Sequence, residues 1–244
     1  MGDLNLLKKF AEENNIDLSE KQLSQFDAFR TCLMEKNKVM NLTAIREPED
    51  IEIKHFIDSL TSVNLIKELK GEKFSLVDLG TGGGFPGIPL KIVFPEADFT
   101  LVDSVGKKIN FVNEAIETLG LKKIKGVASR AEDLGRGKKR ESFDLCTSRA
   151  VAKMEVLLEY CLPLVKVGGY CILYKNADFE EELKDGKRAL KILGGRVAKT
   201  EKFELPKGAG SRGLIVIKKE KAAPVQYPRR PGKPSKSPIK NLSR

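Results

Sequence analysis

The chain has 244 residues and a formal net charge of +10, with 41% hydrophobic residues. This length and hydrophobic content suit one α/β domain with additions, and no apolar run is long enough to cross a membrane. The N-terminus lacks the basic and apolar segments of a signal peptide. Four cysteines without a CxxC pair and a single histidine provide no zinc set, so a cytoplasmic, metal-free protein with reduced thiols is expected.

Three helices are predicted before the first strand, and together residues 1–70 should form a helical cap. The first helix spans residues 3–13 with Asp3 as its N-cap. The second opens with a Ser-x-x-Gln capping box at residues 19–22. The third covers residues 48–66 and begins with a proline, which the first turn of a helix tolerates.

The third helix carries a group of polar side chains on one face. His55, Asp58, Ser59 and Ser62 are spaced i, i+3, i+4 and i+7, so they should lie beside one another. Asp58 is therefore expected to hydrogen-bond His55 and to fix its tautomer. A histidine that is only solvated at a helix edge is the competing interpretation.

A glycine-rich turn follows, between a predicted buried strand and a short predicted helix. Its glycines, which include Gly80, Gly82 and Gly84, allow a ligand to approach the backbone closely. Asp103 ends the next predicted strand, at a separation where an acid can bind the ribose of a cofactor. This arrangement predicts a nucleoside-cofactor site.

Two kinds of cofactor fit the glycine pattern. Gly82, Gly84 and Gly87 satisfy the loose G-x-G-x-x-G pattern of dinucleotide-binding domains. The Asp-x-Gly-x-Gly-x-Gly spacing that begins at Asp78 is a tighter match, and it resembles motif I of class I S-adenosylmethionine-dependent methyltransferases. A glycine turn that binds nothing is the remaining alternative.

An adenine-binding segment is expected one strand further on. Ser104 should cap a helix that ends at Leu119, and a third strand should cover residues 122–128. Residues that leave this strand can reach the adenine, with a backbone N–H to a ring nitrogen and a carboxylate to the exocyclic amine. Ala131 and Glu132 are placed for these contacts. Glu132 as a simple acid at a helix start is the alternative.

The fourth predicted strand, residues 143–148, follows a basic loop at 135–140 that is expected to be solvated. It brings Arg149 to its carboxyl end, where ligands bind in open α/β sheets. A guanidinium there can hold a methionine carboxylate or an RNA phosphate through two hydrogen bonds. A structural arginine that covers the end of the sheet is the alternative.

The last predicted elements of the core complete a mixed sheet. In chain order they are helix 151–166, strand 170–174, helix 178–193 and strands 196–204 and 213–219. The short connection between the last two strands predicts a hairpin, which gives the sheet an antiparallel edge. Such an ending is typical of methyltransferases and not of NAD-binding domains. Residues 71–220 are therefore predicted to form a Rossmann-like α/β core with a mixed seven-stranded sheet.

The C-terminal tail, residues 221–244, contains seven basic residues, five prolines and no acidic residue. A segment of this composition is predicted to stay extended, without a helix, and to bind the phosphates of a nucleic acid. A tail that only aids solubility is the alternative. The predicted RNA contacts of the whole chain are Lys107, Lys175, Arg212, Arg229, Arg230 and Lys233.

The residue pattern narrows the acceptor chemistry. Methylation of a cytosine carbon needs a cysteine nucleophile, but Cys146 lies in the middle of a strand that is predicted to be buried. Methylation of an exocyclic amine usually goes with an Asn/Asp-Pro-Pro-aromatic pattern, and residues 148–150 are Ser-Arg-Ala. Guanine N7 has a free lone pair at neutral pH and needs alignment and exclusion of water, not a general base.

Several of these segments together resemble the RsmG family, also called glucose-inhibited division protein B. They are residues 41–43, 55 with 58–59, 78–90, 103–104 with 106–107, 129–132 and 148–150, within a similarity that covers about residues 20–220. The resemblance implies S-adenosyl-L-methionine-dependent N7-methylation of a guanine in the decoding-region loop of 16S rRNA, a site of the guanine-527 type. It also implies cofactor contacts at Gly80, Phe85, Ala131, Glu132 and Arg149.

The expected partner is therefore 16S rRNA, in the small ribosomal subunit or an assembly intermediate, and the protein is expected to act as a monomer. His55 and Arg149 are the candidate catalytic residues. Two alternatives stay open. One is a methyltransferase that acts on another RNA base or on protein, and the other is a non-catalytic RNA-binding assembly factor.

Overall fold

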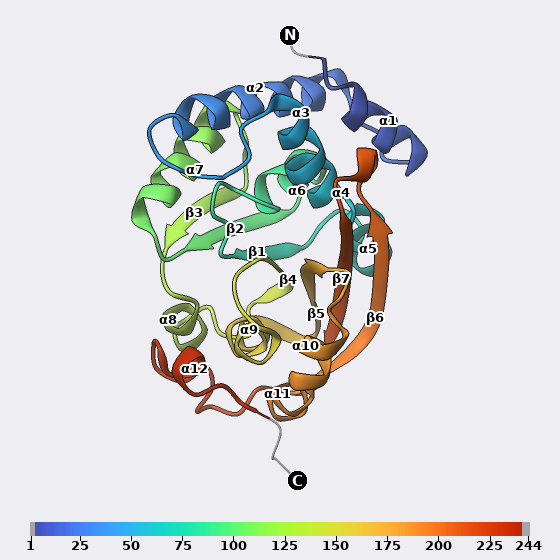
Figure 1. Cartoon of the computed structure of the whole chain (residues 1–244). Helices are drawn as coiled ribbons and strands as arrows, with labels where there is room; N and C mark the ends of the chain where they lie inside the picture. The colour runs from blue at the N-terminus through green and yellow to red at the C-terminus, as the bar shows by residue number, and fades with distance from the viewer. Residues whose placement is uncertain (1–2, 241–244) are drawn as a thin grey trace.

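The computed structural model describes residues 3–240, which form a seven-stranded sheet with helices on both faces (Figure 1). The strand order is β3-β2-β1-β4-β5-β7-β6. The strands are β1 (Ser75–Leu79), β2 (Asp98–Asp103), β3 (Ile124–Ala128), β4 (Phe143–Arg149), β5 (Val165–Asn176), β6 (Gly195–Glu204) and β7 (Ser211–Lys219). β7 is antiparallel to both β5 and β6, and the other neighbouring pairs are parallel. This mixed sheet with its terminal hairpin confirms the predicted fold class.

One face of the sheet is covered by the N-terminal helices together with two helices of the core (Figure 1). They are α1 (Asn5–Glu13), α2 (Glu20–Asn37), α3 (Pro48–Ile51), a π-helical turn η1 (Glu52–Ile57), α4 (Asp58–Leu60), α5 (Val63–Lys70), α6 (Gly87–Val93) and α7 (Gly106–Thr118). The other face is covered by later helices. They are α8 (Ala131–Arg136), α9 (Met154–Cys161), α10 (Glu180–Asp185), α11 (Lys187–Leu193) and α12 (Lys233–Lys236).

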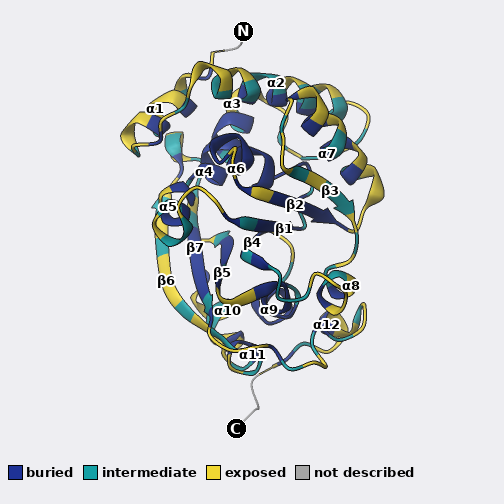
Figure 2. Ribbon diagram, turned by 180° about the vertical axis from the view of Figure 1, so that it is seen from behind, coloured by how far each residue is buried: buried dark blue, intermediate teal, exposed yellow. Residues whose placement is uncertain are grey.

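The central strand β1 shows why the sheet must be covered on both faces. Leu76 packs into the apolar core under the N-terminal helices, whereas Val77 and Leu79 pack into the core under α9 and α11. Because side chains of a strand point alternately to opposite faces, a strand buried on both faces is apolar at nearly every position. The central strands are accordingly buried, and the outer surfaces of the helices are exposed (Figure 2).

One of the three predicted N-caps is confirmed, and α3 begins at Pro48 as predicted. Ser19 and Gln22 form the reciprocal capping box, with the Ser19 hydroxyl and the Gln22 side chain each accepting from the other's backbone N–H. The prediction for Asp3 is wrong, because its carboxylate accepts from the Asn5 side chain and α1 begins without a side-chain cap. Ser104 is not a cap either, because the Val105 amide donates to the side chain of Asp103 instead.

The long predicted helices are interrupted. The third one passes through the π turn η1, ends at Leu60 and restarts as α5, so residues after the turn are rotated relative to a continuous α-helix. Helix 151–166 ends earlier, and β5 begins at Val165, because an apolar run cannot distinguish a buried strand from a buried helix. Helix 178–193 divides at Gly186, where a Cβ atom would lie 2.5 Å from Met154 Cγ.

The prediction of an extended tail is wrong, whereas the basic loop is largely exposed as predicted, at residues 136–139. Residues 221–240 pack across α8, α9 and α11, and α12 forms one short helical turn with Pro234 near its start, where the missing N–H costs nothing (Figure 1). In the loop, Arg140 donates hydrogen bonds to three carbonyl oxygens of the tail, those of Ala223, Pro224 and Tyr227. Arg244, one of the seven basic residues of the tail, lies outside the described residues.

Over residues 3–240, none of the helices combines the length and the apolar character that a membrane span requires.

Candidate cofactor and acceptor site

The glycine turn connects the end of β1 to α6. Gly80, Gly82 and Gly84 all have positive φ angles, of 71°, 57° and 95°, which favour glycine. A Cβ atom would lie 2.2 Å from Val151 Cγ2 at Gly80, whereas at Gly82 the nearest atom would be a backbone oxygen at 3.9 Å. The space around Gly82 is therefore open to a ligand, whereas at Gly80 the side chain of Val151 fills the space.

The side chain of Asp78 stabilises this turn through two hydrogen bonds. Its Oδ2 atom accepts from the Gly87 amide at 3.1 Å, and its Oδ1 atom accepts from the Thr147 hydroxyl at 3.0 Å. The carboxyl group is completely buried, and this burial raises its pKa to about 6. Asp78 thus links β1, the start of α6 and β4, and its role is structural.

The predicted nucleoside contacts line one cavity of about 480 Å³. Asp103 accepts from the Gly82 amide at 3.0 Å through Oδ2 and from the Val105 amide at 2.9 Å through Oδ1. Ala131 and Glu132 line the same cavity from the start of α8, so the fold brings these predicted residues together. Two tail residues, Gly232 and Ser235, also line it, and the sequence analysis did not associate them with the cofactor.

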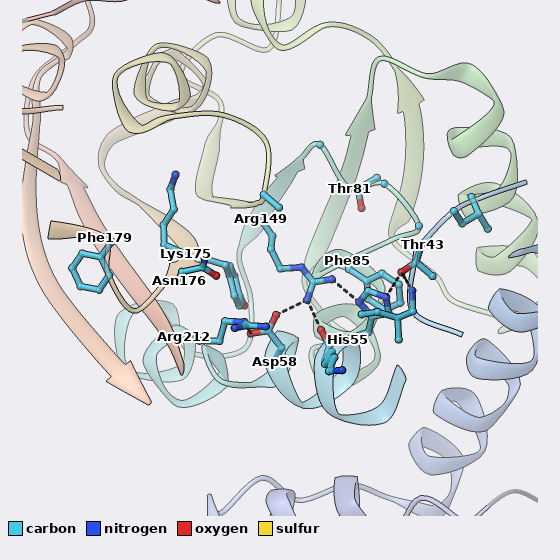
Figure 3. A pocket seen from close by; sticks show the side chains of 18 of the residues that line it. Thr43, His55, Asp58, Thr81, Phe85, Arg149, Lys175, Asn176, Phe179 and Arg212 are labelled. Carbon is cyan, nitrogen blue, oxygen red and sulfur yellow. Dashed lines mark hydrogen bonds and ion pairs between the residues drawn. The ribbon is translucent and has the colours of Figure 1, made fainter. Parts of the chain in front are cut away.

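A second cavity of about 670 Å³ lies on the other side of the glycine turn (Figure 3). Gly80 and Ala150 line both cavities, so the two adjoin across the carboxyl ends of β1 and β4. The second cavity is lined by Thr43, His55, Asp58, Thr81, Gly82, Phe85, Arg149, Lys175 and Arg212, among others. Together the cavities can take an elongated ligand with a polar group at each end.

Arg149 organises the polar side of the second cavity. Its Nη1 atom donates to Asp58 Oδ2 at 2.6 Å, and its Nη2 atom lies 3.1 Å from His55 Nδ1 (Figure 3). The predicted hydrogen bond between Asp58 and His55 is therefore wrong, because the guanidinium lies between the two side chains. The helix spacing indicated the correct face but could not reveal a partner that arrives from β4.

The protonation state of His55 follows from these contacts. A guanidinium can only donate, so Nδ1 must accept from Arg149, and the proton must reside on Nε2, which faces the Thr43 hydroxyl at 2.9 Å. Burial and the charge of Arg149 lower the pKa of His55 to about 3. The ring also stacks on Phe85 with the centroids 4.2 Å apart. His55 is therefore a neutral, fixed ring whose Nδ1 lone pair is already engaged by Arg149.

One carboxylate oxygen in this cavity has no hydrogen-bond partner among the described residues. It is Oδ1 of Asp58, a buried side chain, and the Arg212 Nε atom lies 3.9 Å from it. A buried acceptor without a donor is costly, so this oxygen is suited to a donor group on a bound molecule.

The six predicted RNA contacts do not form a single surface. Lys175 and Arg212 line the second cavity, where Lys175 also donates to the Ala152 carbonyl at 3.0 Å. Arg229 is held by Glu159 at 2.6 Å. The remaining three, Lys107, Arg230 and Lys233, are exposed.

Cys146 is buried, as predicted, and lies against the thiols of Cys161 and Cys171. Burial raises the pKa of its thiol well above the usual value. A nucleophilic thiolate at this position is therefore disfavoured, and the thiols are part of the core.

A Rossmann-like sheet with an antiparallel seventh strand, and a glycine turn between two adjoining cavities, define a class I S-adenosylmethionine-dependent methyltransferase. A solved structure of a SAM-dependent methyltransferase from Aquifex aeolicus shares this fold, with a TM-score of 0.50 and 18% identity over 75% of this chain and 97% of that chain.

Sequence comparison identifies the family. The family described as rRNA small subunit methyltransferase G, or GidB, matches residues 22–210. A "Ribosomal RNA small subunit methyltransferase G" from Desulforamulus reducens is 47% identical over 98% of this chain and 100% of the relative. One of the same name from Staphylococcus carnosus is 46% identical over 93% of this chain and 95% of the relative. The chain belongs to the rRNA small subunit methyltransferase G family.

Proposed function

We propose that this protein transfers a methyl group from S-adenosyl-L-methionine to N7 of a guanine in the decoding-region loop of 16S rRNA. The observation that carries the choice of N7 is the state of the single imidazole in the acceptor cavity. His55 is neutral, and its Nδ1 atom is already occupied by Arg149, so it does not serve to remove a proton. An acceptor that must lose a proton fits this cavity poorly, whereas guanine N7 reacts through a free lone pair.

The nucleoside end of the cofactor fits the smaller cavity. Asp103 can accept from the ribose hydroxyls, while the Ala131 amide and the Glu132 carboxylate, from residues that line the same cavity, can bind the adenine. The open backbone around Gly82 leads from there into the larger cavity. When bound, the cofactor supplies an electrophilic methyl group on a sulfonium sulfur.

The guanine fits the larger cavity, next to the glycine turn. The unpartnered Oδ1 atom of Asp58 can accept from the N1–H and N2–H₂ donors on the edge of the guanine. Arg149 holds Asp58 from the other side and so keeps its orientation. The residues would thus orient the base and exclude water, so that the N7 lone pair can bond to the methyl carbon as the carbon–sulfur bond breaks and its electron pair returns to sulfur; no proton leaves the base.

We place this reaction in the bacterial cytoplasm, on the small subunit or an assembly intermediate. The relatives are named for ribosomal RNA of the small subunit, and the net charge of +10 favours a polyanionic partner. Lys107, Arg230 and Lys233 are the exposed candidates for phosphate contacts.

Nucleoside analysis tests the proposal. The 16S rRNA from a strain that lacks the gene should lose one 7-methylguanosine, and the purified protein with S-adenosyl-L-methionine should restore it. Small subunits and free rRNA from this strain are the two substrates to compare. Unchanged 7-methylguanosine with loss of another methylated nucleoside would assign a different acceptor. Normal methylation, together with no heat of S-adenosyl-L-methionine binding in calorimetry, would favour a non-catalytic assembly factor.

A further inference from the structure

One side of the basic tail is buried, and an ion pair between Arg229 and Glu159, here called the anchor, attaches it to the core. The carboxylate of Glu159, on α9, is fully buried and accepts from Arg229 through both of its oxygens. The Arg229 backbone amide donates to the same carboxylate at 2.8 Å. A buried charge with a bidentate partner is strongly destabilised when that partner is removed, so Arg229 fixes this part of the tail.

Further contacts hold the tail upstream of this anchor. The Ala223 amide donates to Glu141 Oε1 at 2.9 Å, and the Arg140 guanidinium donates to the Ala223 carbonyl at 2.6 Å. The side chain of Ala223 is itself buried in the core under α9 and α11. The tail is thus a packed element of the fold along this length.

The anchored tail leads directly to the nucleoside cavity. Three residues beyond Arg229, the Gly232 amide donates to Glu132 Oε1 at 3.0 Å. Gly232 and Ser235 line this cavity together with Asp103. Glu132 is 5% exposed, so the Gly232 contact limits the positions that its carboxylate can adopt.

We propose that Gly232 and Ser235, held in place by the Arg229 anchor, form a wall of the nucleoside end of the cofactor site, and that the Gly232 amide orients the Glu132 carboxylate toward the adenine amine. This inference rests on the proposed cofactor site. In this arrangement one carboxylate oxygen is held by the tail, and the other is left for the exocyclic amine. The tail then contributes to cofactor affinity through its buried side.

A pair of neighbouring arginines provides a matched test. Arg229→Ala removes the anchor, whereas Arg230→Ala removes the same charge from an exposed position one residue away. By isothermal titration calorimetry, Arg229→Ala should weaken the binding of S-adenosylhomocysteine about tenfold or more, and Arg230→Ala should leave it unchanged. Equal affinities of the two variants would overturn the proposal.

The orientation of Glu132 has its own measurement. The wild-type protein should prefer S-adenosylhomocysteine over S-inosylhomocysteine, which has a carbonyl in place of the amine, and Arg229→Ala should lose most of this preference. A preference that is unchanged in a weakened variant would show general destabilisation and overturn the role of the tail. If Glu132→Gln alone leaves binding unchanged, the proposed cofactor site itself is wrong. If Glu132→Gln weakens binding and Arg229→Ala does not, only the role of the tail is wrong.

The wild-type protein allows a test that does not depend on the folding of a variant. Binding free energies are coupled reciprocally, so a tail that increases cofactor affinity must be held more tightly when the cofactor is bound. Limited trypsin cleavage after the exposed Lys236, which is followed by Ser237, should therefore slow several-fold in saturating S-adenosyl-L-methionine. Equal cleavage rates with and without the cofactor would contradict the inference.

Discussion

Single residues in the acceptor cavity owe their chemistry to their neighbours. His55 is the only histidine of the chain, and its charge state is set by burial and by the guanidinium of Arg149. One carboxylate oxygen of Asp58 accepts from Arg149, and the other has no hydrogen-bond partner among the described residues. These two residues lie on one short helical segment, yet Arg149 on β4 determines what each of them can do.

His55 should make stability depend on pH in a defined window. Its pKa falls from 6.5 to about 3 on folding, so between these values the unfolded chain binds a proton that the folded protein excludes. This contribution to stability is fully present above pH 6.5 and is lost as the pH falls toward 3. Between pH 7.5 and pH 5, the wild type should lose about 2 kcal/mol relative to His55→Gln in urea unfolding.

The comparison with His55→Gln removes other titrating groups from the result. Asp78, whose pKa is raised to about 6, acts in the opposite direction below that pH, but it is present in both proteins. The same difference in unfolding free energy at pH 7.5 and pH 5 would show that His55 is not a buried neutral ring.

At the scale of the element, the turn between β1 and α6 needs glycine for two different reasons. Some of its glycines are needed because neighbouring side chains fill the space, whereas Gly82 has open space around it and needs glycine for its positive φ. Gly87, the first residue of α6, belongs to the first kind. A Cβ atom there would lie 2.2 Å from Leu101 Cδ2 and 2.9 Å from Asp78 Oδ2.

Gly82→Asp should abolish cofactor binding. It places a carboxylate in the open space of the turn, beside Asp103, and should weaken S-adenosyl-L-methionine binding by at least about a hundredfold in calorimetry. Gly71→Asp is the matched control, because Gly71 also has a positive φ, of 68°, but lies at the exposed end of α5. Affinity that survives in Gly82→Asp would refute the position of the cofactor.

Gly87→Ala should destabilise the fold. The added methyl group must displace Leu101 and the buried carboxyl of Asp78, at a cost of about 1–3 kcal/mol in urea unfolding. Gly106→Ala, at the first position of α7 with nothing within 4 Å of the new atom, should be neutral or slightly stabilising. Equal unfolding midpoints for the two variants would show that the turn can adjust.

In the molecule as a whole, the sheet brings distant residues to one edge. The carboxyl ends of β1, β2, β3 and β4 carry the glycine turn, Asp103, the start of α8 and Arg149, and both cavities lie along this edge. Lys107 and the exposed cations of the tail lie near this edge and therefore near the two cavities. The cations at the opposite, amino edge of the sheet are farther from the cavities.

Salt dependence should distinguish these two groups of cations. Replacement of Lys107, Arg230 and Lys233 by Gln should lower the slope of log K against log salt for 16S rRNA binding by about 2–3. Lys21, Lys73 and Lys122 are the matched control, because all three are exposed, Lys73 and Lys122 precede β1 and β3 at the amino edge, and Lys21 lines a pocket together with Lys122. If both triple variants lose the same slope, RNA binding has no preferred face.

Local patterns explain which parts of the fold could be predicted. The buried strands, the capping box at Ser19, the glycine turn and the terminal hairpin all depend on residues within a few positions of one another. The same patterns placed Gly80, Asp103, Ala131 and Glu132 at strand ends, and the parallel sheet then brought them into one cavity. Where an apolar run was ambiguous, as at Val165, the local pattern was insufficient.

The sequence by itself determined the class of fold and the cofactor turn, because strand periodicity, glycine conformation and proline placement act within one element. Only the tertiary structure decided which groups bind each other. Arg149 and His55 are 94 residues apart, and Gly232 and Glu132 are 100 apart. Hydrogen bonds over such separations are selected by burial and packing, because a buried polar group takes the nearest partner that the fold supplies.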